Sequence, residues 1–234
     1  MYDFDVIVIG AGPAGYEAAS LLGNGGKSVC VIEKSEETVG GTCLNEGCVP
    51  AKNFLETSSY IKKAKYFETT GVRGERKPLD LITLQASTHC LIQDLKIGIF
   101  NKLKKGKVTI EYDTASFLDN HTIKLANQEK TLTSEHIIIA SGSSHRDHPH
   151  LAHEGETILS SREDFKLQTI PESNLVIGGG AIGCEFASFF NALGTQVHIA
   201  EFTPKLVPHE DDDVARTLKR ELEKSGITVD VKAN

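Results

Sequence analysis

The sequence contains no tryptophan, a single methionine and no apolar run of the ~18 residues that a membrane-spanning helix needs. It has 25 basic and 32 acidic side chains, a net charge of −7, and no block of lysine and arginine interleaved with aromatic residues. We therefore expect small molecules or other proteins as partners, and neither nucleic acid nor a membrane. A strand-like apolar segment begins at residue 4 and leaves no room for a signal peptide, so we expect a cytoplasmic protein.

The five cysteines are an odd number for a disulfide framework, and such frameworks are rare in the reducing cytoplasm. Cys30, Cys90 and Cys184 lie in apolar stretches, where cysteine usually fills space in the core. Cys43 and Cys48 differ from them because they lie between glycines, in GGTCLNEGCVPAK. The candidate roles are a metal site, a structural cross-link, a redox-active pair, or a chance pair in a glycine-rich loop.

The residues around the pair bear on these alternatives. A zinc site would need a second closely spaced pair of ligands, and the remaining cysteines supply none. Residues five apart in a regular helix lie about 8.6 Å apart, too far for a disulfide. Gly40, Gly41 and Gly47 allow an irregular backbone that would bring the sulfurs closer. Pro50 suits the first turn of a helix, so we expect Cys48 near a helix N-terminus, where the dipole stabilises a nucleophilic thiolate.

A unit of strand, glycine turn, helix and strand occurs twice. FDVIVI leads into GAGPAG, a helical segment and a strand that ends at Glu33. NLVIGGGAIG leads in the same way into a helical segment and a strand that ends at Glu201. The spacing from Gly10 to Glu33 and from Gly178 to Glu201 is 23 positions in both units.

This pattern is typical of dinucleotide binding. The first glycine allows a tight turn, the second lets the backbone approach a pyrophosphate, and the third packs the helix against the strand. The acid at the end of the second strand accepts a hydrogen bond from a ribose hydroxyl. A phosphate-free turn with a chance acid is the alternative for either copy alone, whereas two copies predict two dinucleotides. Glu201 would repel a 2′-phosphate and no arginine follows it in FTPKLVPHE, which favours NAD over NADP.

Residues 50–66 and 79–104, between the two copies, have helical spacing, and short strand-like segments from KVTIEY to EHIIIASG predict a β-meander. A polar stretch follows that contains His145, His148, His150 and His153. We expect a solvated linker there and no metal site, because no carboxylate or cysteine pattern supports one. The expected fold class is α/β. Its domains are a Rossmann-like nucleotide-binding domain with a β-meander at 1–143, an interdomain linker at 144–170, and an incomplete second Rossmann-like domain at 171–234.

The same motifs carry a resemblance. GAGPAG with Glu33, GGTCLNEGCVPAK, IIIASG and GGGAIGCEFAS, in this order along essentially the whole chain, resemble the flavin-dependent pyridine nucleotide-disulfide oxidoreductases. The similarity is greatest to the branch that oxidises dihydrolipoyl groups. It implies FAD on the first unit, NAD on the second and a redox-active disulfide between Cys43 and Cys48. It also implies a dihydrolipoyl-bearing protein or a small disulfide as substrate, and a homodimer as the full-length form.

The resemblance assigns roles to individual residues. Cys48 is implied to lie nearer the flavin and to form the charge-transfer thiolate, while Cys43 exchanges with the substrate. Lys52 is implied to lie near the flavin N5 and to pair with Glu185. The expected catalytic residues are Cys43, Cys48, Lys52 and Glu185, without a metal. The expected cofactor-binding residues are Gly10, Gly12, Pro13, Ala14, Gly15, Glu33, Lys34, Gly41, Thr42, Lys52, Thr114, Ala115, Ala140, Ser141, Gly142, Gly178, Gly180, Ala181, Ile182, Gly183 and Glu201.

The chain also departs from the family pattern. Ala51 stands where serine or threonine is usual, and Ser141 where threonine is usual. Family members continue for about as many residues again, through a dimerisation domain that supplies an acid–base histidine. We therefore expect this chain to be inactive by itself, and we assign no acid–base histidine. The alternatives are a relative that acts on a different disulfide or on mercuric ion, and a non-catalytic fragment.

Overall fold

The computed structural model describes residues 1–72, 78–144, 151 and 155–233. Their contacts divide the chain into two compact units, which are Met1–Pro50 with Thr88–Arg162, and Ala51–Ser87 with Glu163–Asn234. Helices α3 (Cys48–Thr69) and α4 (Leu81–Lys105) each have residues in both units. The sequence did not anticipate that residues 51–87 group with the second unit, and the domain boundaries predicted at 143 and 171 stay a prediction.

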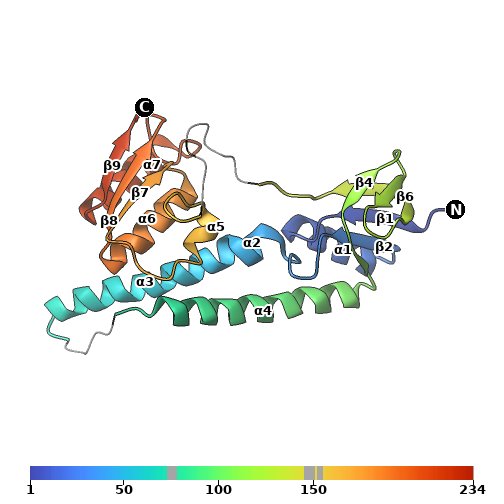
Figure 1. Ribbon diagram of the computed structural model, residues 1–234, viewed down its shortest axis with the longest axis horizontal. Helices are drawn as coiled ribbons and strands as arrows, with labels where there is room; N and C mark the ends of the chain where they lie inside the picture. The colour runs from blue at the N-terminus through green and yellow to red at the C-terminus, as the bar shows by residue number, and fades with distance from the viewer. Residues whose placement is uncertain (73–77, 145–150, 152–154, 234) are drawn as a thin grey trace. The chain divides into compact units, whose positions relative to one another are not determined.

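The first unit is built on a sheet whose strand order is β3-β2-β1-β6-β5-β4. Figure 1 labels β1, β2, β4 and β6 of this sheet. Strands β3, β2, β1 and β6 are parallel, and β6, β5 and β4 are antiparallel. Helix α1 (Pro13–Asn24) is the crossover that two parallel strands require between β1 and β2. The strands are β1 (Phe4–Ile9), β2 (Val29–Glu33), β3 (Thr109–Tyr112), β4 (Ala115–Phe117), β5 (Thr122–Leu125) and β6 (Thr131–Ile139). The expected α/β fold is confirmed.

Strand β6 differs from the sequence-based prediction of short strand-like segments up to EHIIIASG, because it begins at Thr131, well before that segment. The structure has one strand that changes partner: Thr131 to Thr133 pair antiparallel with β5, and the residues from Ser134 onward pair parallel with β1. The polar residues in the middle resemble a turn in the sequence. Ser134 is nevertheless fully buried, and its hydroxyl donates to the His136 carbonyl at 2.8 Å. The polar group is thus satisfied inside a continuous strand.

The alternation of side chains along β1 and β2 explains how this sheet is buried. Val6 and Val8 share one cluster with residues of α1 and α4, such as Ala19 and Leu103. Ile7 falls on the opposite face, in a cluster with residues of β5 and β6. Because successive side chains of a strand point to opposite faces, an uninterrupted apolar run is required where both faces are covered.

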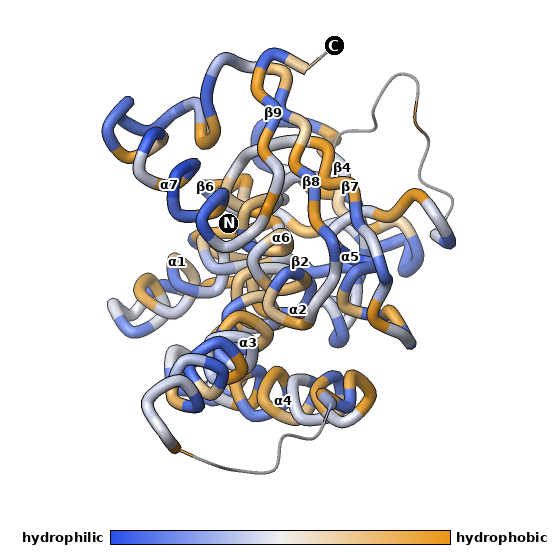
Figure 2. Tube along the Cα trace, turned by 90° about the vertical axis from the view of Figure 1, so that its left-hand side faces the viewer, coloured by the Kyte–Doolittle hydropathy of each residue, from blue (hydrophilic) through white to orange (hydrophobic). Residues whose placement is uncertain are grey.

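The second unit contains a parallel sheet of order β7-β8-β9 in the part of the chain that the structure describes. In its core, Phe186, Phe189 and Phe190 of α6 cluster with Phe54 of α3 and Leu84 of α4. Figure 2 shows α6 as mainly hydrophobic and α7 as mainly hydrophilic. The colour of α7 is expected for a helix that buries only one narrow stripe. The elements are α5 (Ser161–Asp164), β7 (Ser173–Ile177), α6 (Ala181–Leu193), β8 (Gln196–Glu201), α7 (Asp212–Lys224) and β9 (Thr228–Val231).

The three cysteines predicted to fill the core do not behave alike. Cys30 and Cys184 are buried as expected, and burial raises the pKa of the Cys30 thiol to about 12 and that of the Cys184 thiol to about 11. The prediction for Cys90 was wrong, because this residue of α4 is exposed. The apolar face of α4 in the first unit passes instead through Ile92 and Ile99.

The described residues contain neither a membrane-spanning helix nor a cluster of metal-ligating side chains. No helix among them is long and apolar enough to cross a membrane. No three histidine, cysteine, aspartate or glutamate side chains among them come together as a metal site would require. The linker histidines His145, His148, His150 and His153 lie outside the described residues.

Asp164 at the end of α5 provides a pH-dependent test of the second unit. Burial, aided by the charge of Glu163, raises the pKa of this carboxyl from 3.8 to about 7. Between these two values the folded chain binds more protons than the unfolded chain, so the free energy of unfolding falls as the pH rises from ~4 to ~7. Asp164→Asn is expected to stabilise the chain at pH 8 by ~1–3 kcal/mol and to have little effect near pH 4. Urea unfolding at both pH values measures this, and equal effects at the two would contradict it.

Candidate nucleotide and disulfide sites

The glycine turn after β1 presents backbone N–H groups at the start of a helix. Gly10 has φ +103°, and its N–H donates to the Ile32 carbonyl at 2.8 Å. Gly12 is the extended N-cap of α1, without a side-chain cap, and Pro13 and Ala14 follow in the first turn. The first N–H groups of a helix have no partner within the helix, and the helix dipole is positive there. The turn is therefore suited to an anion such as a pyrophosphate.

A close approach of two chain segments explains the third glycine of each motif. A Cβ atom on Gly15 would lie 1.8 Å from the Gly10 carbonyl oxygen. A Cβ atom on Gly183 would lie 2.1 Å from the Gly178 carbonyl oxygen. Both obstacles are backbone atoms that no side-chain rotation can move, so each helix contacts its strand only because glycine is present.

Gly15→Ala is expected to destabilise the first unit by at least ~3 kcal/mol, because the new methyl group must displace the backbone of the glycine turn. Gly98→Ala is the matched control, since Gly98 lies within α4 and a Cβ atom there meets nothing within 4 Å. That change should stabilise the chain by ~0.5–1 kcal/mol through helix propensity alone. Urea denaturation of both variants measures the difference, and two effects of the same sign would disprove the close-approach argument.

Glu33 ends β2 and is held by the turn that it faces. Its Oε2 accepts from the Ala11 N–H at 2.6 Å, and its Oε1 accepts from the Lys34 N–H at 2.9 Å. The Thr38 hydroxyl also donates to Oε1, at 2.8 Å. A carboxylate offers about four acceptor sites, so one remains for a ribose hydroxyl. The acid and the glycine turn therefore form one preorganised cradle.

Several segments converge on this cradle. A Cβ atom on Gly12 would lie 3.7 Å from the Gly41 Cα atom. The Ala140 N–H donates to the Ile9 carbonyl at 2.8 Å, and Ser141 and Gly142 follow it at the end of β6. Gly41, Ala140 and Ser141 thus lie close to the glycine turn, and the binding of a nucleotide by the expected segments stays a prediction.

Thr114 and Ala115 are positioned by Asp113, a residue that sequence reasoning missed. Asp113 is 1 % exposed, its N–H donates to the Glu33 carbonyl at 2.8 Å, and its Oδ1 accepts from the Thr114 N–H at 2.6 Å. Its carboxylate also accepts from the Asn127 N–H at 3.0 and 3.1 Å. Burial opposes ionisation, but these backbone hydrogen bonds hold the pKa of Asp113 below its usual value. An acid directly after the strand-like segment KVTIEY was the only signal in the sequence.

The second unit repeats two hydrogen bonds of this cradle, from the first glycine to the second strand and from the next N–H to the acid. The Gly178 N–H donates to the Ala200 carbonyl at 2.9 Å, and Gly180 is the extended N-cap of α6. Glu201 is 6 % exposed, and its Oε2 accepts from the Gly179 N–H at 2.5 Å. Ala181, Ile182 and Gly183 form the first turn of α6.

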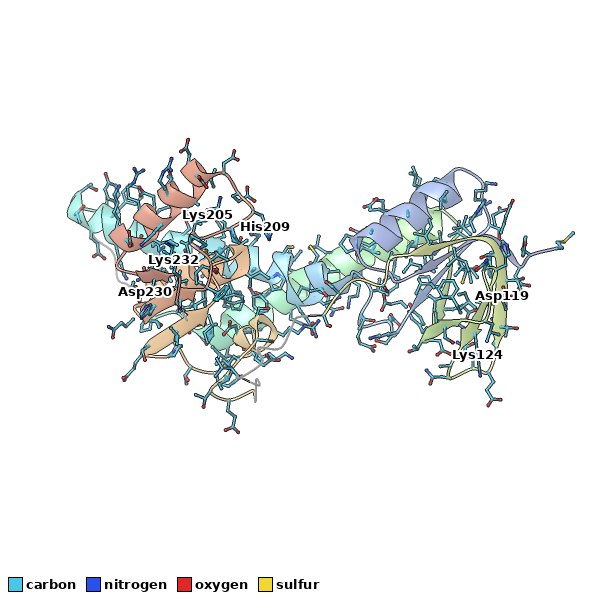
Figure 3. All side chains as sticks on the ribbon, turned by 90° about the horizontal axis from the view of Figure 1, so that it is seen from above. Asp119, Lys124, Lys205, His209, Asp230 and Lys232 are labelled. Carbon is cyan, nitrogen blue, oxygen red and sulfur yellow. The ribbon has the colours of Figure 1, made fainter. Side chains whose placement is uncertain are left out.

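Glu201 remains ionised in spite of its burial. Burial opposes ionisation, but hydrogen bonds from Thr203 and Gly179 outweigh it and hold the Glu201 pKa below its usual value. The Thr203 N–H donates to Glu201 Oε1 at 2.6 Å. Lys205, the next basic residue, donates from Nζ to Asp212 Oδ1 at 2.7 Å and lies beside α7 in Figure 3.

The two cysteines lie on either side of a break between two helices. Cys43 belongs to α2 (Gly41–Glu46), whereas Cys48 is the first residue of α3, as expected. Gly47 ends α2 with φ −138° and ψ −116°. The break lets the two side chains meet: the hydrogen bond to Cys48 is the main cause that raises the Cys43 pKa, and burial and the charge of Cys48 add to it. Both are free thiols.

Asn45 holds the loop that precedes this break. Its Nδ2 donates to the carbonyls of Gly41 at 2.9 Å and Val39 at 3.1 Å. The sequence placed no helix at 41–46, because its stability depends on Gly40 and Gly41 adopting left-handed φ values of +95° and +64°. The hexapeptide GTCLNE has little helix propensity of its own, because Gly, Thr, Cys and Asn are all weak helix formers.

Lys52 and Glu185 form the predicted ion pair within the second unit, between α3 and α6. The side chains are 62 % and 31 % exposed. An exposed pair of this kind contributes at most ~1 kcal/mol to stability. Its presence is therefore not explained by a requirement of the fold.

Comparisons with known proteins show which family this chain belongs to. The family profile described as "Pyridine nucleotide-disulphide oxidoreductase" matches residues 4–234. A dihydrolipoyl dehydrogenase of Bacillus subtilis is 36 % identical over 95 % of this chain and 49 % of its own length, and one of Chlorobaculum parvum is 38 % identical over 97 % and 48 %. The structure of the HOCl-induced flavoprotein disulfide reductase RclA from Escherichia coli superposes with a TM-score of 0.81 at 26 % identity, over 98 % of this chain and 49 % of that one. The chain spans about half the length of these proteins. Flavoproteins of the dihydrolipoyl dehydrogenase type use FAD and NAD(H), in agreement with the cofactors expected from the sequence.

Proposed function

Because the chain belongs to the pyridine nucleotide-disulphide oxidoreductase family, we propose that it carries the nucleotide-binding and cysteine-bearing part of a dihydrolipoyl dehydrogenase. FAD would bind in a domain at 1–143 and NAD in a domain at 171–234. The observation that carries the proposal is the duplicated cradle. In each copy a glutamate accepts from a backbone N–H 22 positions earlier in the chain, directly after the first glycine.

The cysteine pair next to the first cradle suits a dithiol substrate. Gly41 contacts Gly12 at the N-cap of α1, and Cys43 follows two residues later in α2. In the oxidised protein a substrate thiolate would attack the Cys43 sulfur of the Cys43–Cys48 disulfide, and Cys48 would leave as a thiolate. The second substrate thiol would then attack the mixed disulfide and release Cys43 as a thiol. The substrate loses two electrons and two protons, and the cysteine pair gains both electrons. One proton passes to solvent when the first substrate thiol ionises, and the other passes from the second substrate thiol to Cys43.

The geometry of the pair supports this division of roles. Cys48 is at the N-terminus of α3, where the dipole favours an anionic sulfur, and Cys43 is the thiol whose raised pKa keeps it protonated. FAD, when bound, would supply the two-electron chemistry that returns the pair to the disulfide and passes the electrons to NAD. Lys52, paired with Glu185, would place a positive charge close to the flavin.

A visible absorption spectrum of the purified chain tests this proposal. A folded chain with the first cradle intact should take up one FAD and be yellow, and Glu33→Ala should lower FAD affinity by ~10-fold or more. Pro171→Ala, at a position in the other unit with no expected contact to FAD, is the control. A folded chain that remains colourless with excess FAD would refute FAD binding by this chain.

A disulfide reductase with a different substrate is the second candidate, because the Escherichia coli structure with the same fold carries that description. Kinetics with dihydrolipoamide and with other dithiols, on a form with the full length of the relatives, separate the two. We also propose a dihydrolipoyl-bearing protein as partner and a homodimer as the assembly of that form.

A further inference from the structure

Lys96 is a charged residue in an apolar stripe. On α4 it follows Ile92 by four positions and precedes Ile99 by three and Leu103 by seven, and all four side chains are buried. This spacing defines the helix face that packs against the sheet. Lys96 is only 7 % exposed, and a buried ammonium group is costly unless it is hydrogen-bonded. Leucine or methionine would fill the same position without that cost, so packing does not account for the lysine.

The ammonium group is used to hold a loop. Lys96 Nζ donates to the Glu37 carbonyl oxygen at 2.6 Å. Glu37 lies between β2 and α2, in a loop without regular secondary structure that follows Glu33. A charge-assisted hydrogen bond is about twice as strong as a neutral one, and here it fixes the middle of the loop to the sheet-facing side of α4.

The residue after Glu37 contacts the ribose acid of the first cradle. The Thr38 hydroxyl donates to Glu33 Oε1 at 2.8 Å, on the opposite side of the carboxylate from the Ala11 N–H. Two residues further on, the Gly40 N–H donates to the Ala11 carbonyl at 2.9 Å. The loop anchored by Lys96 therefore touches both the acid and the glycine turn, and its displacement would disturb both.

We propose that Lys96 is a positioning residue for the first nucleotide site, which holds Thr38 against Glu33 through the Glu37 carbonyl so that the acid is oriented toward the adenosine ribose of FAD. The inference rests on the proposed binding of FAD to this unit. Lys96 itself contacts neither the acid nor the glycine turn in the described hydrogen bonds, and it acts only through the loop.

The second unit uses a different anchor for the corresponding loop. Lys205 Nζ donates to the Glu210 carbonyl at 2.7 Å, and Thr203 donates from its hydroxyl to the Lys205 carbonyl at 2.8 Å. Here too a lysine holds a loop that contacts the ribose acid. In this case the lysine is part of the loop, whereas Lys96 reaches the loop of the first unit from a helix that follows far along the chain.

Lys96→Met tests the proposal, because methionine preserves the length and the apolar contacts and removes only the ammonium group. The first readout needs no flavin: hydrogen exchange of the Gly40 and Gly41 amides should accelerate about tenfold or more, with the β1 and β2 amides unchanged. The second is affinity. FAD should bind about 5- to 30-fold more weakly, whereas FMN, which lacks the adenosine ribose, should bind as before.

Controls separate positioning from general destabilisation. Lys102→Met removes an exposed lysine of the same helix, which pairs with Glu17, and should change neither readout. Thr38→Val should weaken FAD binding to a similar degree. The double variant with Lys96→Met should bind FAD no more weakly than either single variant, because both substitutions remove the same connection from Lys96 through the loop to Glu33.

Three results would overturn the proposal: unchanged exchange at Gly40 and Gly41, equal loss of FAD and FMN affinity, or fully additive effects with Thr38→Val. If the unmodified chain takes up no FAD, the proposed function of this chain fails, and the exchange measurement alone then decides whether Lys96 positions the loop.

Discussion

Serine in place of Cys43 or of Cys48 is expected to lower the rate of dihydrolipoyl oxidation by at least ~10³-fold in a form of the protein with the full length of its relatives. The reason is that both exchange steps require a disulfide between the two sulfurs, and a hydroxyl group cannot form one. Steady-state kinetics with dihydrolipoamide measure the loss. Cys90→Ser is the matched control, because Cys90 is also exposed but lies on α4 outside the cradle, and its rate should remain normal.

The two variants should differ in their spectra. The hydrogen bond to Cys48 raises the Cys43 pKa, and Cys48 lies at the N-terminus of α3, where the helix dipole favours an anionic sulfur, so we expect Cys48 to carry the negative charge in the reduced pair. Only Cys48→Ser should therefore remove the long-wavelength flavin–thiolate band, while Cys43→Ser should retain it. Equal loss of the band in both variants would mean that the assigned roles are wrong.

The two cradles could be predicted from the sequence, because residues close together in the chain determine them. A glycine turn between an apolar strand and a helix, followed by an acid at a fixed distance, leaves few other structures, and the structure places Glu33 and Glu201 at strand ends facing their own turns. The N-terminal position of Cys48 was also predictable, because Pro50 is tolerated only near the start of a helix.

Features that depend on contacts between distant parts of the chain could not be predicted from the sequence. The change of partner within β6 requires Ser134 to be buried, which no local pattern around that serine predicts. Helix α2 exists because Gly40 and Gly41 adopt left-handed conformations next to the first glycine turn. The spacing of Lys96 places it in an apolar stripe of α4, but only the structure shows the Glu37 carbonyl that gives it a role.

The nicotinamide cofactor should be NAD, with at least about a hundredfold preference over NADP in a form with the full length of the relatives. Glu201 is 6 % exposed and its pKa is lowered by the hydrogen bonds from Thr203 and Gly179, so it carries a negative charge in a partly desolvated cradle. The 2′-phosphate of NADP would bring about two further negative charges against it. A repulsion of only ~3 kcal/mol corresponds to about two orders of magnitude in affinity. Lys205 does not offset this repulsion, because its ammonium group is bound to Asp212.

The variant that combines Glu201→Ala with Thr203→Arg should narrow or reverse this preference, since it removes the repelling charge and adds a guanidinium group that can bind a phosphate bidentately. Asp213→Asn is the control for a general change in charge, because this acid lies on α7 and its side chain is 87 % exposed. The measurement is the ratio of kcat/KM for the two cofactors, which the control should leave unchanged. Comparable use of NAD and NADP by the unmodified protein would show that Glu201 does not bind the ribose, and the second dinucleotide would then have to bind elsewhere.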